Sequence, residues 1–416
     1  MAGTCGCVCF VMRSRALLFA GLLPVLSLAT SSAAAADWPH WRGPDRNGIS
    51  PETGWQDKWP ADGPKVAWKA NVGLGFSSFA VVGGRAFTMG HAAEKDTVFC
   101  FDAVTGKELW KHSYPAELGD KYYEGGTSGT PTVDGDRVFT LNRWGSVYCY
   151  NAADGKVVWS KNVQKETEAR VPDWGFGGAP LVNGPHIILN VGDAGLALDK
   201  KTGAIVWKSA PKNAGYSTPL PMKSGADTLG VLASGKSYVA VNLKDGKEVW
   251  RAKWLTQYEV NASDPIIDGD RLFLSTGYGK GAGIFKLGGA EPEQVWKSKA
   301  LATQMNAAVL FKGHLYGVDG DTSAKASLKC VEFATGTIKW THAGFGSGGV
   351  IIADGKLIAL SGTGELMVAP AKPEGFEPTS RAQVLGGRTW TAPVLANGFI
   401  YVRNSRGDIA AIDVRK

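Results

Sequence analysis

The sequence contains few of the features that mark nucleic-acid binding, hydrolysis or metal binding. Charged residues make up 20% of its 416 positions, with both signs interspersed and no block of Lys or Arg. Without such a block we expect neither nucleic acid nor an anionic membrane surface as a partner. The six histidines are scattered, without metal-ligand spacing and without a Ser/His/Asp arrangement. These patterns therefore indicate no catalytic, cofactor-binding or metal-binding residue.

The first 36 residues have the order of a secretory signal. Arg13 and Arg15 precede an apolar run at residues 16–28, and small residues follow at 33–36. This order predicts a cleaved signal peptide, because a membrane-spanning helix needs about 20 apolar residues. No cysteine follows the run at a lipoprotein position. We expect a mature chain that starts at Asp37, has no transmembrane segment and lies in the periplasm or outside the cell.

One phrase recurs along the rest of the chain: an acidic or Asn residue, a turn with Gly, and Trp eight positions after the first residue. It appears first as Asp-Ala-Val-Thr-Gly-Lys-Glu-Leu-Trp at residues 102–110. It returns at residues 151–159, 199–207, 242–250 and 332–340, and Trp296 continues the series after a divergent turn. Successive Trp residues lie 43 to 49 positions apart. This spacing is typical of a four-stranded propeller blade, which takes about 40–50 residues.

A second turn lies between the Trp residues and separates two β-prone runs. Its polar-Gly or Gly-Gly pairs favour the positive φ angles of tight hairpins. The pairs stand at residues 83–84, 134–135, 183–184, 224–225, 268–269, 312–313, 354–355 and 397–398. Eight turns predict eight blades, and no long amphipathic helix interrupts the β pattern.

The two ends of the repeat region predict how the ring closes. The last blade begins near residue 390 and ends at residue 413 without its Trp strand, which residues 64–68 can supply. A ring closed in this way has no open edge, whereas an open solenoid would need capping units. We therefore predict one domain at residues 64–416. Its fold is all-β, an eight-bladed β-propeller of four-stranded antiparallel blades, closed by an N-terminal strand that joins the C-terminal blade.

The recurring Trp and the residues near it are predicted to be structural. A large flat side chain at one place in each blade fills the space between neighbouring sheets. These residues are Trp68, Trp110, Trp159, Trp207, Trp250, Trp296 and Trp340. Cys100, Cys149 and Cys330 stand two residues before the recurring Asp, Asn or Glu, where other blades have Ala. Sheets packed about 10 Å apart hold these cysteines beyond disulfide reach, so we expect buried free thiols.

The Asp-x-x-Thr-Gly-Lys-x-x-Trp phrase resembles the repeat of the pyrroloquinoline-quinone (PQQ) propellers. That superfamily includes the quinoprotein alcohol dehydrogenases and the propeller subunit of the outer-membrane β-barrel assembly machinery. The resemblance extends over residues 38–413, and residues 37–48 are similar to the N-terminal lead-in of secreted PQQ-like repeat proteins. It implies the propeller fold, which hosts many functions.

The resemblance implies two classes of function. The dehydrogenases resemble one another in an adjacent Cys pair over the quinone, a Ca²⁺ held by carboxylates and an Asn, and an Asp base. This chain has no adjacent Cys pair and no Cys-x-x-Cys-His haem motif. We therefore expect an exported, non-catalytic binding or scaffold module, monomeric and without a cofactor. Its partner would be a protein, peptide or saccharide, and envelope protein assembly is one setting for it.

The alternative hypothesis is a PQQ-dependent quinoprotein dehydrogenase that oxidises an alcohol or a sugar. It would require PQQ and Ca²⁺, and Asp, Asn and carbonyl ligands for Ca²⁺ are plentiful in the chain. A cofactor-free lyase or hydrolase on one propeller face is a third hypothesis, which no motif supports.

The starts of the innermost strands predict where a ligand would bind. They line the central funnel and differ between blades, which is the basis of a pocket hypothesis. The alternative is a water-filled channel lined by the strand ends. The candidate residues are Trp174, Tyr216, Asn261, Asp264, Asn306, Arg388 and Trp390. Residues 37–63 form a lead-in with four Trp, which we expect to pack on the outside of the propeller. The functional alternative for this lead-in is a partner-docking arm.

Overall fold

The computed structural model describes residues 1–9, 11, 35–322 and 324–416. The chain divides into two compact units, Met1–Ser32 and Ala33–Lys416. The described part of the first unit contains no helix or strand, and most of the signal peptide predicted at residues 1–36 lies outside the described residues. No helix among the described residues is long and apolar enough to span a membrane.

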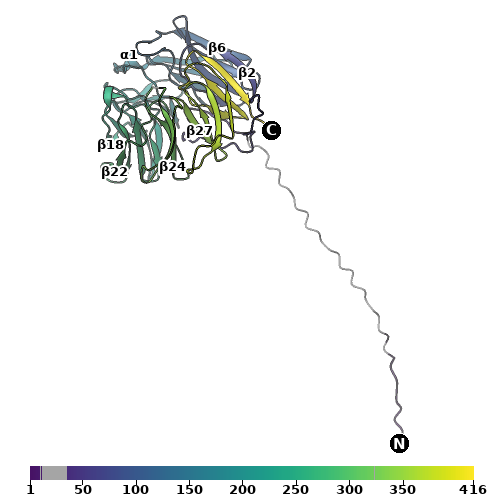
Figure 1. The fold of residues 1–416 in the computed structure, drawn as a ribbon. Coiled ribbons are helices and arrows are strands. Elements are labelled where there is room, and N and C mark those ends of the chain that lie inside the picture. Colours follow the sequence, from purple (N-terminus) through teal and green to yellow (C-terminus); the bar gives the residue numbers. More distant parts are fainter. Residues whose placement is uncertain (10, 12–34, 323) are drawn as a thin grey trace. The chain divides into compact units, whose positions relative to one another are not determined.

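The second unit is a ring of eight β-sheets (Figure 1). Each contains four antiparallel strands, and one of them has a fifth, parallel strand at its inner edge. The first blade contains β3 (Ala80–Val82), β4 (Arg85–Ala92), β5 (Lys95–Asp102) and β6 (Glu108–Pro115). The second contains β7 (Thr132–Asp134), β8 (Arg137–Leu141), β9 (Ser146–Asn151) and β10 (Val157–Asn162). The third contains β11 (Leu181–Asn183), β12 (His186–Leu189), β13 (Leu196–Asp199) and β14 (Ile205–Lys208). The fourth contains β15 (Leu220–Ser224), β16 (Asp227–Ala233), β17 (Ser237–Asn242) and β18 (Glu248–Lys253).

The remaining blades follow the same plan. The fifth contains β19 (Ile266–Asp268), β20 (Arg271–Thr276), β21 (Gly281–Lys286) and β22 (Glu293–Ser298). The sixth contains β23 (Val309–Phe311), β24 (His314–Asp319), β25 (Ser327–Glu332) and β26 (Ile338–His342). The seventh contains β27 (Gly349–Ala353), β28 (Lys356–Leu360), β29 (Glu365–Pro370) and β30 (Ser380–Gln383), and the eighth begins with β31 (Val394–Ala396), β32 (Phe399–Arg403) and β33 (Asp408–Asp413). Helix in the described chain is confined to α1 (Val163–Thr167) and the short 3₁₀ turn η1 (Gln257–Glu259).

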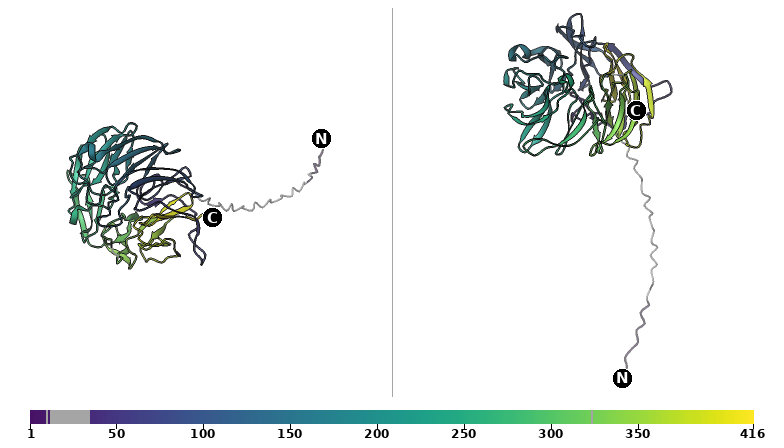
Figure 2. Two further views of the ribbon diagram at one scale, coloured as in Figure 1. Left: turned by 90° about the horizontal axis from the view of Figure 1, so that it is seen from above. Right: turned by 60° about the vertical axis from the view of Figure 1, so that its left-hand side comes forward.

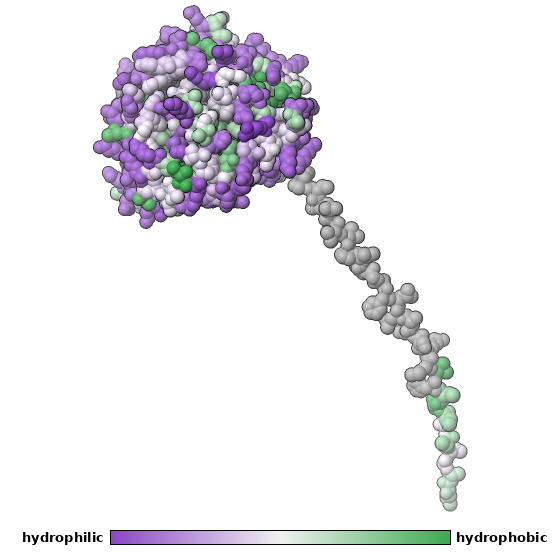
Figure 3. Space-filling view, in the orientation of Figure 1, coloured by the Kyte–Doolittle hydropathy of each residue, from purple (hydrophilic) through white to green (hydrophobic). Residues whose placement is uncertain are grey.

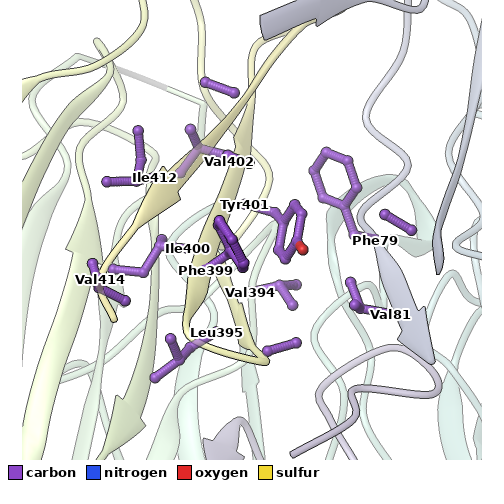
Figure 4. Close-up of a cluster of buried hydrophobic side chains, with 14 of the residues drawn as sticks. Phe79, Val81, Val394, Leu395, Phe399, Ile400, Tyr401, Val402, Ile412 and Val414 are labelled. Atoms are coloured by element: carbon purple, nitrogen blue, oxygen red, sulfur yellow. The ribbon is translucent and has the colours of Figure 1, made fainter. Parts of the chain in front are cut away.

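The eighth blade is completed by β2 (Lys65–Asn71), which pairs antiparallel with β33. The first and last parts of the propeller therefore lie side by side, as both views in Figure 2 show. A buried hydrophobic cluster seals this junction (Figure 4). In it Phe79, beside β3, lies 5.5 Å from Tyr401 of β32, measured between ring centroids. The predicted all-β, eight-bladed fold and its closure are confirmed.

The recurring Trp joins most blades to the next one. Trp110 on β6 donates its indole N–H to the carbonyl of Ala152 in the second blade, at 3.0 Å. Its ring also covers Gly155 of that blade, where a Cβ would lie only 2.5 Å from the ring. The same indole bond joins Trp68 to Ala103, Trp159 to Lys200, Trp207 to Leu243, Trp296 to Phe333 and Trp340 to Lys372. This geometry gives these Trp residues a structural role of the kind that the sequence predicts.

Trp250 departs from this arrangement because its neighbour departs from the repeat. It is buried like Trp68, Trp110 and Trp207, whereas Trp159, Trp296 and Trp340 are half-buried. It faces the fifth blade, whose turn at residues 288–292 differs in sequence from the rest. Among the described residues its indole N–H has no hydrogen-bond partner. The interlock, meaning the contact of a Trp with the turn of the next blade, therefore depends on the turn as well as on the Trp.

The three cysteines of the propeller lie opposite recurring Trp residues. Cys100 pairs across the strands with Trp110, Cys149 with Trp159 and Cys330 with Trp340. The blades without cysteine have Ala197, Ala240 and Ala411 at this place, and Ile284 in the fifth blade. All three cysteines are free and buried. A small side chain opposite the indole is thus a packing requirement of most blades.

The expectation that the lead-in packs on the outside is wrong for its first half. Trp38 exchanges backbone hydrogen bonds with Val81 of β3, and Pro39 accepts one from Val133 of β7. Further along, β1 (Ile49–Ser50) pairs in parallel with β27. All three partners are the innermost strands of their blades, so this segment crosses the interior of the ring. Inner strands present unpaired backbone groups toward the axis, and an extended segment can satisfy them.

The second half of the lead-in reaches the outer edge of the ring. The backbone N–H of Gln56 donates to the carbonyl of Val414, and that of Trp59 to the hydroxyl of Ser380 on β30. Trp55 is buried in the cluster of the closing blades. The lead-in therefore belongs to the folded propeller, in its interior as well as at its edge.

The interlock predicts different costs for two glycine substitutions. Gly155→Ala places a Cβ against Trp110, whereas Gly135→Ala, at a hairpin with φ of +58°, meets nothing within 4 Å. Both lose about 1–2 kcal/mol because φ is positive, and Gly155→Ala loses about 1–3 kcal/mol more from overpacking. Urea unfolding of the two variants measures the difference. Equal losses would show that the Trp–Gly contact does not hold the blades together.

The buried thiols should be unreactive in the folded protein. Burial raises the pKa of Cys100 and of Cys149 to about 12 and that of Cys330 to about 11. Since the thiolate is the reactive form, labelling by a thiol reagent at pH 8 should be slow before unfolding. After denaturation without reductant all three should label. Missing thiols at that stage would reveal a disulfide.

Candidate functional site

A cavity of about 380 Å³ lies at the end of the ring where the innermost strands begin. Its wall comes from the segments that lead into these strands, such as Phe76 before β3, Trp174 and Tyr216 before β11 and β15, and Trp390 before β31. Tyr278 adds a further ring from the β20–β21 turn. These segments lie outside the repeated phrase, so their side chains are free to differ from blade to blade.

Most of the residues predicted for the funnel meet in this cavity. Trp174, Tyr216, Asp264, Asn306 and Trp390 line it together. Two predicted residues, Asn261 and Arg388, do not line it, and the reason differs for each.

Asn261 is fully buried, and its side-chain amide donates to the carbonyls of Ser234 and Trp254 at 2.9 and 3.2 Å. It holds the fourth and fifth blades together instead of facing the axis. Arg388 lies at the rim, where its guanidinium carbon is 4.4 Å from the centroid of the Trp390 ring. It also forms an ion pair with Glu124. The prediction that Asn261 and Arg388 line the cavity is therefore wrong.

The floor of the cavity is made by the lead-in. The indole N–H of Trp41 donates to Oδ2 of Asp264 at 2.5 Å, and the backbone N–H of Thr218 donates to Oδ1 at 2.7 Å. Burial raises the pKa of Asp264, while the nearby Arg42 acts in the opposite direction. Both oxygens of this carboxylate thus hold the lead-in to the fourth and fifth blades. Sequence reasoning missed Trp41 because it placed the lead-in outside.

Two guanidinium groups lie behind this floor. Arg42 donates to the carbonyls of Ala307 and Ala308, at 3.1 and 2.8 Å, and so fixes the lead-in to the sixth blade. Burial lowers the pKa of Arg46 to about 10, and burial together with the charge of Arg46 lowers that of His40 to about 3. His40 is therefore neutral at physiological pH. Asp264 therefore lines the cavity at its floor, and the two guanidinium groups behind it do not line the cavity.

A loop at residues 119–126 covers part of the mouth. The ring of Tyr122 lies 5.2 Å from that of Trp174, and Tyr123 lies 6.4 Å from Trp390, between centroids. Glu124 pairs with Arg388 and accepts a hydrogen bond from Ser405, which ties the loop to the eighth blade. The loop was missed because it belongs to no repeat. The connection from β6 to β7, which is longer than most and contains paired tyrosines and glycines, is the signal that could have indicated it.

Several polar groups of the wall are engaged by the fold. The hydroxyl of Thr130 accepts from the backbone N–H of Ser78, and that of Thr218 from Ala179. The amide of Asn306 donates to the carbonyls of Gly348 and Trp390, at 3.0 and 2.7 Å. These side chains shape the cavity and position its rings.

The cavity does not fit the groups that PQQ chemistry requires. PQQ is a tricarboxylate, and the lining contains no Lys or Arg to meet its charges; the only carboxyl side chain of the lining is that of Asp264. Among the described residues no three His, Cys, Asp or Glu side chains come together in a group that could hold a metal ion. A tricarboxylate in this position would face aromatic rings and a carboxylate, so no catalytic step is derived through the quinone.

Comparisons with known proteins agree with the fold. The family described as outer membrane protein assembly factor BamB matches residues 94–342. BamB from Moraxella catarrhalis is 14% identical, with a TM-score of 0.63, over 84% of this chain and 99% of that one. Quinohemoprotein alcohol dehydrogenase from Comamonas testosteroni is also 14% identical, with a TM-score of 0.68, over 93% and 82%. A search of curated proteins found no match. Identities this low show a shared fold.

The bond between Trp41 and Asp264 should stabilise the floor. Trp41→Phe keeps the ring but removes the N–H, leaving Oδ2 of a buried carboxylate without this donor. We expect a loss of about 1–3 kcal/mol in the free energy of unfolding, together with faster proteolysis within residues 37–50. Trp59→Phe is the matched control, because its indole bond to Gln56 is exposed, and should cost less than about 0.5 kcal/mol. Equal losses of unfolding free energy in the two variants would show that the bond between Trp41 and Asp264 does not stabilise the floor.

Proposed function

The chain belongs to the family of outer membrane protein assembly factor BamB, and we propose that it is an exported, non-catalytic binding module that takes a ligand into its central cavity. The cavity carries this proposal. It is closed at one end by Trp41 and Asp264, and eight of the residues that line it are aromatic. A concave, largely apolar site with a few convergent polar groups is the usual form of a ligand pocket.

The hydrogen bonds that Asp264 accepts support a binding role over a catalytic one. Asp264 is the one carboxylate of the lining, and both of its oxygens are engaged by Trp41 and Thr218. A general acid or base needs an oxygen that can reach a substrate proton. A carboxylate used in this way stabilises the shape of a binding site.

The family description supports a second form of the proposal, a scaffold in envelope protein assembly. A scaffold would use an outer face of the propeller instead of the cavity. The face drawn in Figure 3 is mainly hydrophilic, with small and separate apolar groups. This face therefore shows no contiguous apolar patch of the kind that marks many protein interfaces.

The experiment that tests the proposed function starts from the full chain purified from its source. We expect native mass spectrometry to detect a small bound ligand, and a Trp174→Ala, Trp390→Ala double variant to lose it while Trp59→Ala keeps it. Addition of PQQ and Ca²⁺ should produce no dye reduction with alcohols or sugars. Quinone-dependent dye reduction would overturn the proposal in favour of the dehydrogenase. A protein partner retained equally by all variants would favour the scaffold.

A further inference from the structure

We propose that the ligand of this cavity is a neutral saccharide of one or two rings, held beneath the loop at residues 119–126. The inference rests on the proposed function, since it names the chemical class of the ligand for the same site. Four properties of the cavity lead to it: its charge, its aromatic wall, its unengaged polar groups and its covered mouth.

The charges around the cavity favour an uncharged ligand. At the floor, Asp264 is opposed by Arg42 and Arg46, and four of the five N–H donors of Arg42 bond to backbone carbonyls. At the rim, Arg388 is paired with Glu124. A charged ligand would lose its hydration here without meeting an unpaired opposite charge, which is unfavourable.

The wall favours a ligand with apolar faces. Trp174 and Trp390 line the cavity together with Phe76 and Tyr216, and Trp390 stacks on Phe76 with 5.2 Å between centroids. The Trp174 ring is held by Tyr216 in an edge-on contact at 6.0 Å. Rigid rings of this kind provide a large contact area with little loss of conformational entropy. The C–H faces of a pyranose ring are apolar and flat enough to lie against them.

The unengaged polar groups favour a ligand with hydroxyls at its edges. Asn306 uses both amide hydrogens on the fold, and among the described residues its Oδ1 has no partner. Gln304 uses its Oε1 to accept from Gly277, and among the same residues its amide N–H groups have no partner. The hydroxyl of Ser128 is likewise without one in the described chain. A purely aromatic ligand would leave these groups unsatisfied, whereas sugar hydroxyls can both donate and accept.

The covering loop explains how a small ligand would be enclosed. Residues 120–124 lie between Gly119 and the pair Gly125 and Gly126, which have φ angles of +67°, +74° and +84°. The loop sets Tyr122 and Tyr123 against the wall, as their contacts with Trp174 and Trp390 show. The volume of about 380 Å³ is near the lower end of the usual range for ligand pockets, about 300–1,000 Å³, which suits one or two sugar rings.

The test uses the full mature chain and a panel of neutral sugars: glucose, galactose, mannose, N-acetylglucosamine, cellobiose and maltose. Titration calorimetry should detect at least one of them, with a matching change in Trp fluorescence. Trp174→Ala should weaken binding about tenfold or more, and Ser128→Ala several-fold without a change in Tm, because this hydroxyl bonds to no described residue. Trp59→Ala and Ser160→Ala, outside the cavity, are the matched controls and should bind normally.

Other outcomes overturn the inference in distinguishable ways. Binding of tetramethylammonium, glucuronate or indole in place of the neutral sugars, with loss in Trp174→Ala, would overturn the saccharide class and leave the proposed function standing. Sugar binding that all four variants retain equally would place the sugar outside the cavity and also overturn it. If no probe binds and native mass spectrometry finds no ligand in the cavity, both the inference and the proposed function fail.

Discussion

Each recurring Trp bridges two blades, and the ring depends on this contact. Its side chain fills the gap between sheets, and in all of them except Trp250 the indole N–H donates to a carbonyl of the next blade, as that of Trp110 does to Ala152. The Gly of that turn must lack a side chain to let the ring approach, and its positive φ suits the turn. Because Trp68 makes the same contact from the N-terminal strand to Ala103 in the first blade, one repeated interaction also closes the ring.

Each blade of such a ring keeps a short outer edge, and its innermost strand has unpaired backbone groups as well. The innermost strands direct unpaired backbone groups toward the axis, where water is limited. The lead-in satisfies part of them through Trp38, Pro39 and β1, and the guanidinium of Arg42 satisfies the carbonyls of Ala307 and Ala308. Arg403 does the same at the junction of the first and last blades, with bonds to the carbonyls of Ser77 and Met89. The floor of the cavity is therefore a consequence of completing the backbone hydrogen bonds.

The repeat made much of the fold predictable, because each blade solves the same packing problem with the same residues. The spacing of Trp and Gly indicated the blade number and the closing strand, and the small residue opposite Trp indicated buried cysteines. The position of residues before the inner strands correctly grouped Trp174, Tyr216, Asp264, Asn306 and Trp390. It could not separate Asn261, whose amide turns toward neighbouring carbonyls, from residues that face the axis. Trp41 and the loop at 119–126 stand outside any repeat, so no periodic signal located them.

In this family the repeated residues determine the architecture, and the unrepeated residues determine the chemistry. The repeat is compatible with a dehydrogenase and with an assembly factor, since the blades need the same Trp and Gly in either case. What a propeller binds is decided at the ends of the inner strands, where side chains are not required for packing between blades. In this chain eight of the lining residues are aromatic, and the one carboxylate is engaged by Trp41 and Thr218. The hydroxyls of an uncharged ligand can bond to the unengaged amide groups of such a site, whereas the carboxylates of a quinone would meet no Lys or Arg in its lining.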